Sequence, residues 1–338
     1  MNVFARVTAI EYVLPDNSLT NDELAREFPE WNVDKIFNKT GISDRRIIAQ
    51  DECASDLAFL ACEKLLATGT IDRSEIDFII LCTQSPDYFL PATACILQDR
   101  LGLSTLCGAF DYNQGCSGFI YGLGLAKGLI ETGQAKNILL VTAESYSKFI
   151  HPADKSVRTL FGDAAAATLI QASASGPFLD RFRYGTDGAG AKNLIVPIGG
   201  ARHPAALNLE PELYTDDSGN SRTDANLYMN GSAIFEFSMR RVPELFASLF
   251  DDGFTIDHVD LFAFHQANKF MLDSLRRRIK LPSEKFIAEF AHCGNTVSSS
   301  IPIALKESLN KGVLVEGKTV AGVGFGVGYS WAGCIIKW

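Results

Sequence analysis

Apolar and polar residues follow two different periods along the first half of the chain, and their order predicts a layered α/β protein. Residues 54–69 (ASDLAFLACEKLLATG) repeat their apolar positions at helical spacing and stop at a glycine. Residues 76–84 (IDFIILCTQ) form a continuous apolar run, which is typical of a strand buried on both faces. The same order continues with helical patterns at 91–103 and 117–133 and strand patterns at 106–113, 137–145 and 161–173. Helices and strands that alternate in this way predict a parallel sheet.

The second half of the chain repeats this scheme after a stretch of weak periodicity, 172–222, that contains glycines and prolines. Its pattern predicts helices at 232–250, 266–280 and 301–312, a strand at 259–265 and a closing hairpin at 318–338. We therefore expect two similar halves, 1–172 and 173–338, that share the order of their elements rather than their sequence. Catalytic groups would then lie at the carboxyl ends of strands.

Composition and charge narrow the class of protein. The chain has 338 residues, of which 47% are apolar and 21% charged, and this is typical of a well-packed globular protein. A net charge of −9 argues against a nucleic-acid partner, because phosphate binding needs a surplus of Lys and Arg on one face. No apolar run approaches the roughly 20 residues of a membrane-spanning helix. The first residues lack the pattern of a signal peptide, so we expect a cytoplasmic protein without a membrane partner.

Eight cysteines occur without any CxxC pair, and most lie in apolar stretches, which predicts reduced and buried thiols. Cys116 differs from the others in its neighbours, because it lies in FDYNQGCSGFIYGLGLAKG between a predicted strand and a helix. The start of a helix favours a thiolate, and Gly115 and Gly118 leave room for a substrate carbonyl. This context predicts a nucleophile, and the alternative is a cysteine that only fills the core.

Two further polar residues stand where they could assist a nucleophile. His265 follows the predicted strand VDLFAFH, and a neutral imidazole there could stabilise charge on a thioester carbonyl. Asn295 lies in the polar turn HCGNTVSSSIPIAL and offers an amide donor that does not titrate. Asn268 either locks the loop after His265 or orients a water molecule. We interpret His292 as a loop residue, because no strand end presents it.

The glycine-rich tail GVGFGVGYSWAG is not a dinucleotide loop, because no helix follows it to bind a phosphate. It predicts instead a backbone N–H directed at the active site, where it would complete an oxyanion hole with the amide of Cys116. The five histidines are scattered and no HExxH or paired-cysteine spacing occurs, so we expect no metal site. The absence of a GxSxG motif argues against a serine hydrolase.

Six motifs, QGCSGF, FHQAN, HCGNTVSSSIP, LFGDAAAA, KTGISDRR and GFGVGYSWAG, together resemble β-ketoacyl-acyl-carrier-protein synthase III over the whole chain. The resemblance implies a five-layered αβαβα thiolase fold, an obligate homodimer, and neither a metal nor a redox cofactor. In that family a cysteine takes an acyl group from acyl-CoA; malonyl-acyl carrier protein then loses CO₂ and attacks the acyl-enzyme. By motif position, Cys116 would be the nucleophile, and His265 and Asn295 would stabilise the decarboxylating thioester.

The resemblance also assigns residues around the reacting groups. Elongating ketosynthases have a second histidine in place of Asn295, so this set is similar to the type III branch, which includes plant-type polyketide synthases. Phe325 matches an active-site aromatic residue, and Val327 stands where a glycine commonly supplies its N–H. Leu90 matches a residue that reaches across the dimer into the neighbour's acyl pocket. The alternative is that Leu90 only packs at the interface.

Substrate and carrier contacts follow from the same resemblance. Trp31 resembles the tryptophan that stacks on the adenine of coenzyme A, although it lies four residues further from the TG pair than is usual. Lys39 and Lys155 replace arginines that contact the nucleotide, which keeps the charge but loses the bidentate geometry, and Arg158 lies nearby. A basic run on the helix after His265 resembles the patch that receives the acyl carrier protein, or is a solvated face. This run consists of Arg276, Arg277, Arg278 and Lys280.

Three alternatives remain open at this point. An acyltransferase of the same fold would pass the acyl group from Cys116 to an alcohol or amine without releasing CO₂. A catalytically silent subunit would keep the fold without needing a nucleophile, and alkylation of Cys116 distinguishes it from an enzyme. A papain-like hydrolase also uses Cys, His and Asn, but its local signature C-G-[SA]-C-[WY] does not occur in the chain.

Overall fold

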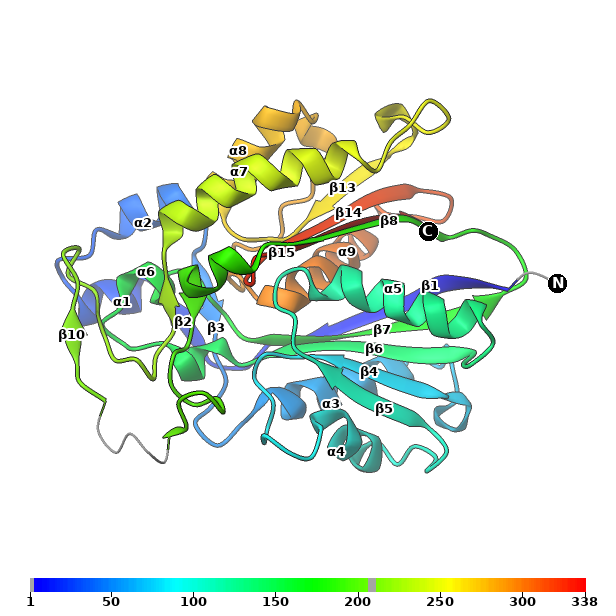
Figure 1. The fold of residues 1–338 in the computed structure, drawn as a ribbon, viewed down its shortest axis with the longest axis horizontal. Coiled ribbons are helices and arrows are strands. Elements are labelled where there is room, and N and C mark those ends of the chain that lie inside the picture. The colour runs from blue at the N-terminus through cyan, green and yellow to red at the C-terminus, as the bar shows by residue number, and fades with distance from the viewer. Residues whose placement is uncertain (1–2, 206–210) are drawn as a thin grey trace.

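Two mixed β-sheets form the framework of the protein, which we describe from a computed structural model for residues 3–205 and 211–338 (Figure 1). The first sheet has the strand order β1 (Phe4–Val13), β7 (Ala164–Ser173), β6 (Asn137–Glu144), β4 (Phe78–Cys82), β5 (Gly108–Tyr112). The second has the order β13 (Leu261–Phe264), β14 (Thr319–Gly326), β15 (Ser330–Lys337), β8 (Leu179–Thr186). The strands of the first sheet thus precede all those of the second.

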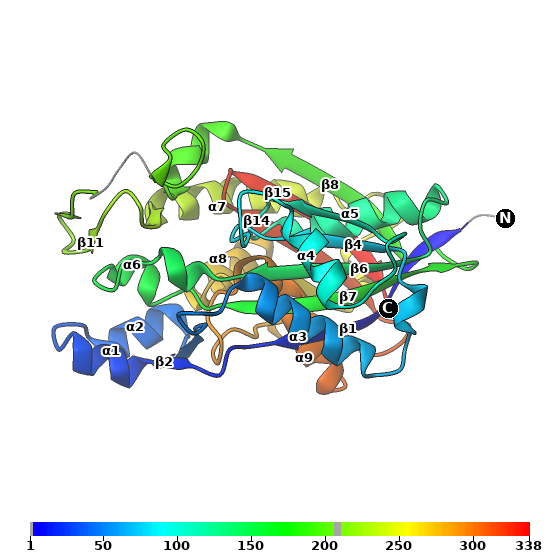
Figure 2. The same ribbon diagram turned by 90° about the horizontal axis from the view of Figure 1, so that it is seen from below.

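Three helical layers alternate with the sheets and complete the expected αβαβα sandwich. Figure 1 shows α5 (Gly118–Glu131) and α9 (Ser300–Asn310) between the two sheets. Their apolar residues share one core with both sheets, so that Phe119 and Ile301 belong to the same cluster as Ile80 of β4 and Ile336 of β15. Figure 2 shows α3 (Ala54–Leu66) and α4 (Thr93–Arg100) over the outer face of the first sheet. The other outer layer consists of α7 (Gly231–Ala247) and α8 (Lys269–Ile279), which pack on the second sheet.

The prediction of a parallel sheet was correct for only part of each sheet. Strand β4 is parallel to β5 and β6, and β13 is parallel to β14. Strand β7 is antiparallel to both β6 and β1, and β15 is antiparallel to β14 and β8. The reason is that Ala164 of β7 pairs with Glu144 of β6, so the connection returns to the edge of the sheet that it left instead of crossing over.

Short elements gather at one end of the sandwich, on the side opposite to the chain termini (Figures 1 and 2). They include helices α1 (Asn21–Glu27), α2 (Val33–Thr40) and α6 (Lys155–Arg158). They also include the strand pairs β2 (Ser18–Thr20) with β3 (Asp44–Arg46), β9 (Leu194–Ile195) with β12 (Tyr228–Met229), and β10 (Tyr214–Thr215) with β11 (Ser221–Arg222). Strand β8 and three of these short strands lie in the stretch 172–222, for which the sequence predicted no element.

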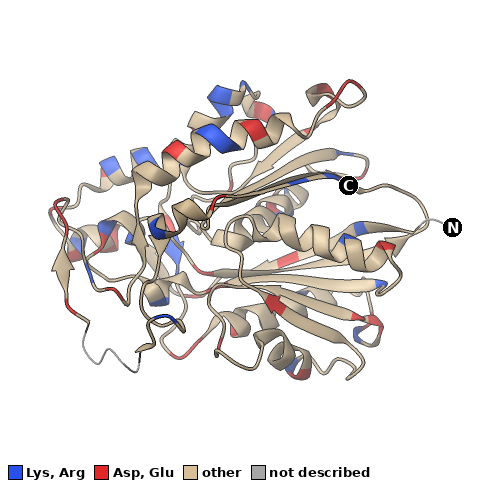
Figure 3. Cartoon of the chain, in the orientation of Figure 1, with Lys and Arg blue, Asp and Glu red and all other residues tan. Residues whose placement is uncertain are grey.

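Charged side chains lie mainly on the outer helices and loops, as Figure 3 shows. Strands β4, β7, β13 and β14 contain no charged residue, which fits their burial between helical layers. Within 3–205 and 211–338, no helix has both the length and the apolar character that crossing a bilayer requires. The same residues contain no group of three or more His, Cys, Asp or Glu side chains arranged to hold a metal ion.

Candidate active site

Cys116 lies where the two halves of the molecule meet. It follows β5 and precedes the first turn of α5, and only 5% of its surface is exposed. The end of β14, from the other sheet, passes directly over it: a β-carbon built on Gly326 would lie 2.9 Å from both Cβ and Sγ of Cys116. Only glycine therefore allows this approach. Behind Cys116, a β-carbon on Gly115 would lie 2.5 Å from Cγ1 of Val327, so the tail also touches the preceding residue.

Opposing effects act on the pKa of the Cys116 thiol. Burial, and after it the Glu144 carboxyl group, raises the pKa of Cys116 to about 12. The backbone N–H groups of Cys116 and Val327 act in the other direction. The sequence led us to expect that the start of a helix would favour the thiolate; in the structure burial outweighs that effect. The N–H groups of Cys116 and Val327 are thus the two backbone donors that favour the thiolate.

His265 is fully enclosed directly after β13. Its backbone N–H donates to the carbonyl of Val323 at 2.8 Å, which continues the parallel pairing with β14. Burial lowers the pKa of His265 to about 3, so the imidazole is neutral at physiological pH. Its ring packs edge-on against Phe325, with the ring centroids 5.6 Å apart.

Ser300, in the first turn of α9, determines which nitrogen of this imidazole carries the proton. Its hydroxyl donates to the carbonyl of Val297 at 2.9 Å and lies 2.8 Å from Nδ1 of His265. A hydroxyl has one proton, so while that proton goes to Val297 the ring donates from Nδ1–H to Ser300. When the hydroxyl turns to donate to Nδ1, the proton of the ring is on Nε2, which becomes a hydrogen-bond donor. That tautomer suits the stabilisation of a carbonyl oxygen.

Asn295 is held by both its backbone and its side chain. Its N–H donates to the carbonyl of Leu160 at 2.8 Å, and its carbonyl accepts from Gly162 at 3.1 Å. Oδ1 accepts from the N–H of Val297 at 2.9 Å, and Val297 has a left-handed backbone with φ of 54°. With Oδ1 engaged and no partner for Nδ2 among the described residues, the amide presents a free donor. The turn from Asn295 to Ser300 thus carries one predicted residue and orients His265.

A cavity of about 1020 Å³ opens at the end of the molecule where the short elements gather. Lys39 of α2, Lys155 of α6 and Asn268 line it, together with Met229 and Phe235. Asn268 is also the N-cap of α8, where its side chain accepts from the N–H of Met271 at 2.9 Å. Of its two predicted roles, locking the loop is the one for which the structure gives a contact. The volume is at the upper end of the range for small-molecule sites.

Two residues predicted to contact the nucleotide do not line this cavity. Trp31 is only 7% exposed and stacks on Phe28, with the rings 4.2 Å apart. Arg158 forms a bidentate ion pair with Glu27 at 2.9 and 2.7 Å and lies over the ring of Phe28. Their side chains are therefore engaged within the protein. The motif resemblance could not reveal the contact of Arg158, because Glu27 ends helix α1, far from Arg158 in the chain; Phe28 follows that helix directly.

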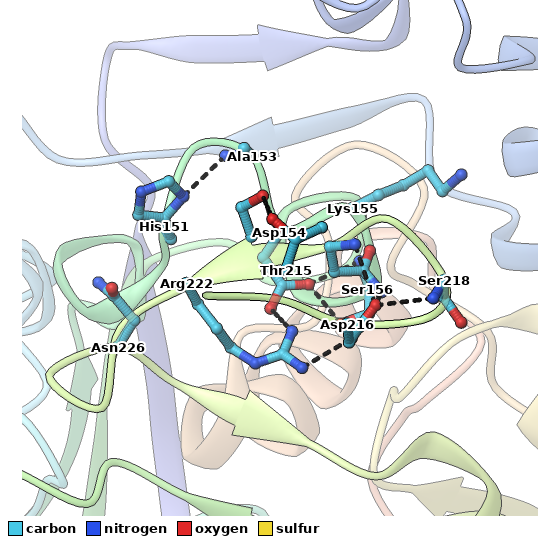
Figure 4. A network of polar contacts seen from close by, with 12 residues as sticks. His151, Ala153, Asp154, Lys155, Ser156, Thr215, Asp216, Ser218, Arg222 and Asn226 are labelled. Carbon is cyan, nitrogen blue, oxygen red and sulfur yellow. Dashed lines mark hydrogen bonds and ion pairs between the residues drawn. The ribbon is translucent and has the colours of Figure 1, made fainter. Parts of the chain in front are cut away.

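A buried ion-pair network supports the cavity wall that carries Lys155 (Figure 4). Arg222, at the end of β11, contacts Asp154 at 2.6 Å and Asp216 at 2.7 Å, and both Arg222 and Asp154 are buried. Asp154 also caps α6 by accepting from the N–H of Ser156 at 3.0 Å. The network thus joins the β10–β11 hairpin to the helix that bears Lys155. Asp216 and Arg222 lie within the weakly periodic stretch, and the network was not found from the sequence.

The remaining predicted residues lie on the surface. Leu90 is 81% exposed and follows Phe89, which is 86% exposed. The basic run lies at the C-terminal end of α8, where Arg277, Arg278 and the C-cap Lys280 are exposed. Arg276 is partly buried and donates to the carbonyl of Leu281 at 3.3 Å.

Comparisons with known proteins agree on one family. A family model described as 3-Oxoacyl-[acyl-carrier-protein (ACP)] synthase III matches residues 110–188, and one for the C-terminal part of the same enzyme matches residues 249–338. The chain is 36% identical to a Beta-ketoacyl-[acyl-carrier-protein] synthase III of Caldanaerobacter subterraneus subsp. tengcongensis, over 96% of this chain and 95% of the relative.

Solved structures give the same result. A crystal structure of a 3-oxoacyl-(acyl-carrier-protein) synthase III is 50% identical with a TM-score of 0.97, over 99% of this chain and 100% of the other. The 3-oxoacyl-(acyl-carrier protein) synthase of Burkholderia xenovorans LB400 is 37% identical with a TM-score of 0.89, over 98% and 93% of the two chains.

Proposed function

The chain belongs to the β-ketoacyl-acyl-carrier-protein synthase III family and is a condensing acyltransferase, and we propose that Cys116, His265 and Asn295 carry its reaction. The observation that carries this proposal is the close approach of Gly326, at the end of β14, to Cβ and Sγ of Cys116, where the backbone N–H groups of Cys116 and Val327 both favour negative charge. Such a pair of fixed donors suits an oxyanion, because it needs no rearrangement as charge develops.

In the first step, the sulfur of Cys116 attacks the carbonyl carbon of an acyl-CoA thioester. The bond to the sulfur of coenzyme A breaks, a new thioester forms on Cys116, and the thiol proton leaves with coenzyme A. The backbone N–H groups of Cys116 and Val327 stabilise the tetrahedral oxyanion. Phe325 packs beside His265 and excludes water from the same space.

In the second step, the malonyl group of malonyl-acyl carrier protein loses CO₂ and leaves an enolate of the thioester. Nε2–H of His265 and Nδ2 of Asn295 donate to the enolate oxygen, and neither group has to change its charge. The enolate carbon attacks the acyl-Cys116 carbonyl, the cysteine sulfur leaves, and a 3-ketoacyl thioester results. The first step exchanges one thioester for another, and the second joins two carbon atoms with loss of CO₂. Neither step needs an external oxidant or reductant, so the reaction requires no redox cofactor.

The cavity is proposed to admit the pantetheine arm of either substrate. Lys39 and Lys155 would pair with phosphate groups at its mouth, and Asn268 lies on its wall. Trp31 and Arg158 would have to leave Phe28 and Glu27 to reach a nucleotide, so we do not include them. The exposed basic residues of α8 would receive the acidic carrier protein by charge complementarity.

A homodimer is proposed from the open edge of the first sheet. Strand β5 forms that edge and pairs only with β4 among the described strands. Exposed apolar residues stand nearby in sequence, with Phe89 86%, Leu90 81% and Leu106 93% accessible. A second copy would cover these side chains and pair the edge, and would bring Leu90 to the acyl site of its neighbour.

The experiment that tests the proposed function is intact-protein mass spectrometry after incubation with a panel of acyl-CoAs, followed by addition of malonyl-acyl carrier protein. We expect a mass gain at Cys116 that disappears as CO₂ and a 3-ketoacyl product form. Cys116→Ala should take up no label, whereas His265→Ala and Asn295→Ala should be acylated but fail to condense. Intact condensation by either of these two variants would contradict the assignment, and transfer of the label without CO₂ release would favour an acyltransferase.

A further inference from the structure

Glu144 is a buried carboxyl group that the reaction described above does not use. It is the last residue of β6, it is 0% exposed, and both of its oxygens are engaged. Oε1 accepts from the hydroxyl of Ser298 at 2.6 Å. Oε2 accepts from the N–H of Gln84 at 3.1 Å and from the hydroxyl of Ser85 at 3.2 Å. Burial raises its pKa to about 8.

One of these bonds leads to the turn that presents Asn295. Ser298 is the middle residue of the 3₁₀ turn Val297–Ser299, which begins directly after Thr296. Asn295 holds the left-handed Val297 through its own Oδ1. Glu144 therefore fixes the far side of the same turn, and its Ser298 bond joins β6 of the first sheet to the segment that carries the amide donor.

The other bonds lead to the segment behind Cys116. The side-chain oxygen of Gln84 would lie 2.6 Å from a β-carbon on Gly115, so Gln84 packs directly against the residue before the nucleophile. The same oxygen accepts a hydrogen bond from the hydroxyl of Tyr146, and Nε2 of Gln84 donates to Asn113 at 3.0 Å. Because Glu144 accepts from the backbone N–H of Gln84, it also fixes the position of the side chain that packs against Gly115, directly before Cys116.

We propose that Glu144 is a positioning residue that sets the placement of Cys116 relative to Asn295, and that its negative charge opposes formation of the Cys116 thiolate. This proposal rests on the function proposed above and deepens it. Charges within a dry protein interior are poorly screened, so a buried carboxylate that interacts with the buried Cys116 thiol raises the cost of the thiolate. Other titratable groups that interact with Glu144 are Cys82 of β4, Tyr112 of β5, Tyr146 and Asp163.

The charge of Glu144 depends on pH in a known direction. With a pKa of about 8 the carboxyl group is mostly neutral at pH 7 and becomes charged above pH 8. Cys116 ionises at still higher pH, so in the native protein it must ionise next to a charged Glu144. A variant with a neutral amide in place of the carboxyl group should therefore ionise Cys116 at lower pH.

The test is the pH dependence of Cys116 alkylation by iodoacetamide, followed by mass spectrometry of the peptide that contains Cys116, in the absence of any substrate. In Glu144→Gln we expect the pH midpoint of Cys116 alkylation to fall by about one pH unit or more, because the variant lacks the neighbouring like charge. The control is Glu11→Gln. Glu11 lies on strand β1 and is another buried carboxylate, which pairs with Lys64 and Lys306. An unchanged midpoint in Glu144→Gln would overturn the electrostatic part of the proposal.

Ser298→Ala tests the positioning part and leaves the charge in place. We expect acylation of Cys116 at the native rate and a condensation rate that falls about tenfold, because the turn of Asn295 loses its anchor. Equal loss in both steps, or no loss, would overturn the positioning role. Acylation of the unchanged protein by acyl-CoA tests the proposed function separately, because the alkylation midpoint needs no substrate.

Discussion

The approach of Gly326 to Cys116 leaves no room for even one additional carbon atom. A β-carbon at that position would lie 2.9 Å from the sulfur of Cys116, on the terminal residue of a central strand that cannot easily shift. Cys116, the proposed nucleophile, and the end of β14 are thus fitted to each other at atomic scale. The tail proposed to supply a backbone donor also limits the space above the thiol.

Gly326→Ala should reduce acylation of Cys116 by about a hundredfold or more, since a displacement of the reacting groups by ~1 Å has effects of this size. The rate of mass gain with acyl-CoA measures it. Gly128→Ala is the matched control, because a β-carbon there meets nothing within 4 Å on the helix α5. Equal acylation of the native protein and Gly326→Ala would show that the tail does not confine the thiol.

The neutral state of His265 should make the protein less stable in acid. Its pKa is about 3 in the folded protein and near 6.5 when exposed, so between these values only the unfolded chain takes up the proton. The free energy of unfolding, relative to His265→Gln, should therefore fall as pH decreases below 6.5, by up to about 1.4 kcal/mol per pH unit. Urea unfolding at pH 7 and pH 5 measures the difference, and a constant value at both would contradict burial of the neutral ring.

At the scale of single residues, the sequence was sufficient to locate those that stand in a distinctive local pattern. Cys116 and His265 each stand between a predicted strand and a predicted helix, and the structure places them there. Glu144 gave no such signal, because its role depends on Ser298, which lies 154 residues away in the chain. Arg158 was likewise named by the family resemblance, and it pairs with Glu27, which lies 131 residues away in the chain. Contacts between distant segments cannot be read from local pattern.

Among the elements, the hairpin β10–β11 and the helix α6 depend on one guanidinium group. Each is too short to be stable alone, and Arg222 joins them through Asp154 and Asp216. Lys155 follows Asp154 directly, so the position of a cavity-lining cation is set by a buried ion pair.

Arg222→Ala should lower the free energy of unfolding by about 3 kcal/mol, because it leaves the buried Asp154 carboxylate without its partner. It should also raise the KM for acyl-CoA more than it lowers kcat, since Lys155 loses its support. Arg241→Ala is the control, because its pair with Glu244 is exposed and exposed pairs contribute about 0.5 kcal/mol. Thermal unfolding and initial rates measure both effects, and similar results for the two variants would refute the supporting role.

The hydrophobic pattern predicted the long elements well and the direction of some strands wrongly. Helices α3, α5 and α8 lie within their expected ranges because one face of each packs on a sheet. Periodicity carries no information on whether a chain crosses over or turns back, and β7 was therefore assigned the wrong direction. Strand β8 was missed because it is partly exposed along most of its length and shows no clean alternation.

At the scale of the whole molecule, the resemblance of six short motifs identified the αβαβα sandwich that composition alone left undefined. The exposed surface of the molecule bears on its proposed assembly as a dimer. Phe89 and Leu90 are almost fully exposed a few residues before Thr93, whose N–H donates to Asp111 of the open edge strand β5, and such side chains are seldom left in water near an unpaired strand.

Phe89→Asp should therefore convert a dimer into monomers, because a charge would be buried at the contact. Light scattering coupled to size-exclusion chromatography gives the mass of each species. Val315→Asp alters another exposed apolar residue, 46% accessible, and should leave the mass unchanged. A native protein that elutes at the mass of one chain would contradict the proposed dimer.

The central helical layer has a consequence for the synthesis of the protein in the cell. Helix α5 packs on the first sheet with one face and on β14 and β15 with the other, and these strands follow it far along the chain. While the ribosome makes the intervening segment, the second face of α5 has no cover. We expect the nascent chain to expose this apolar surface until translation is nearly finished. Chaperones that bind apolar segments should therefore bind the nascent chain during this time.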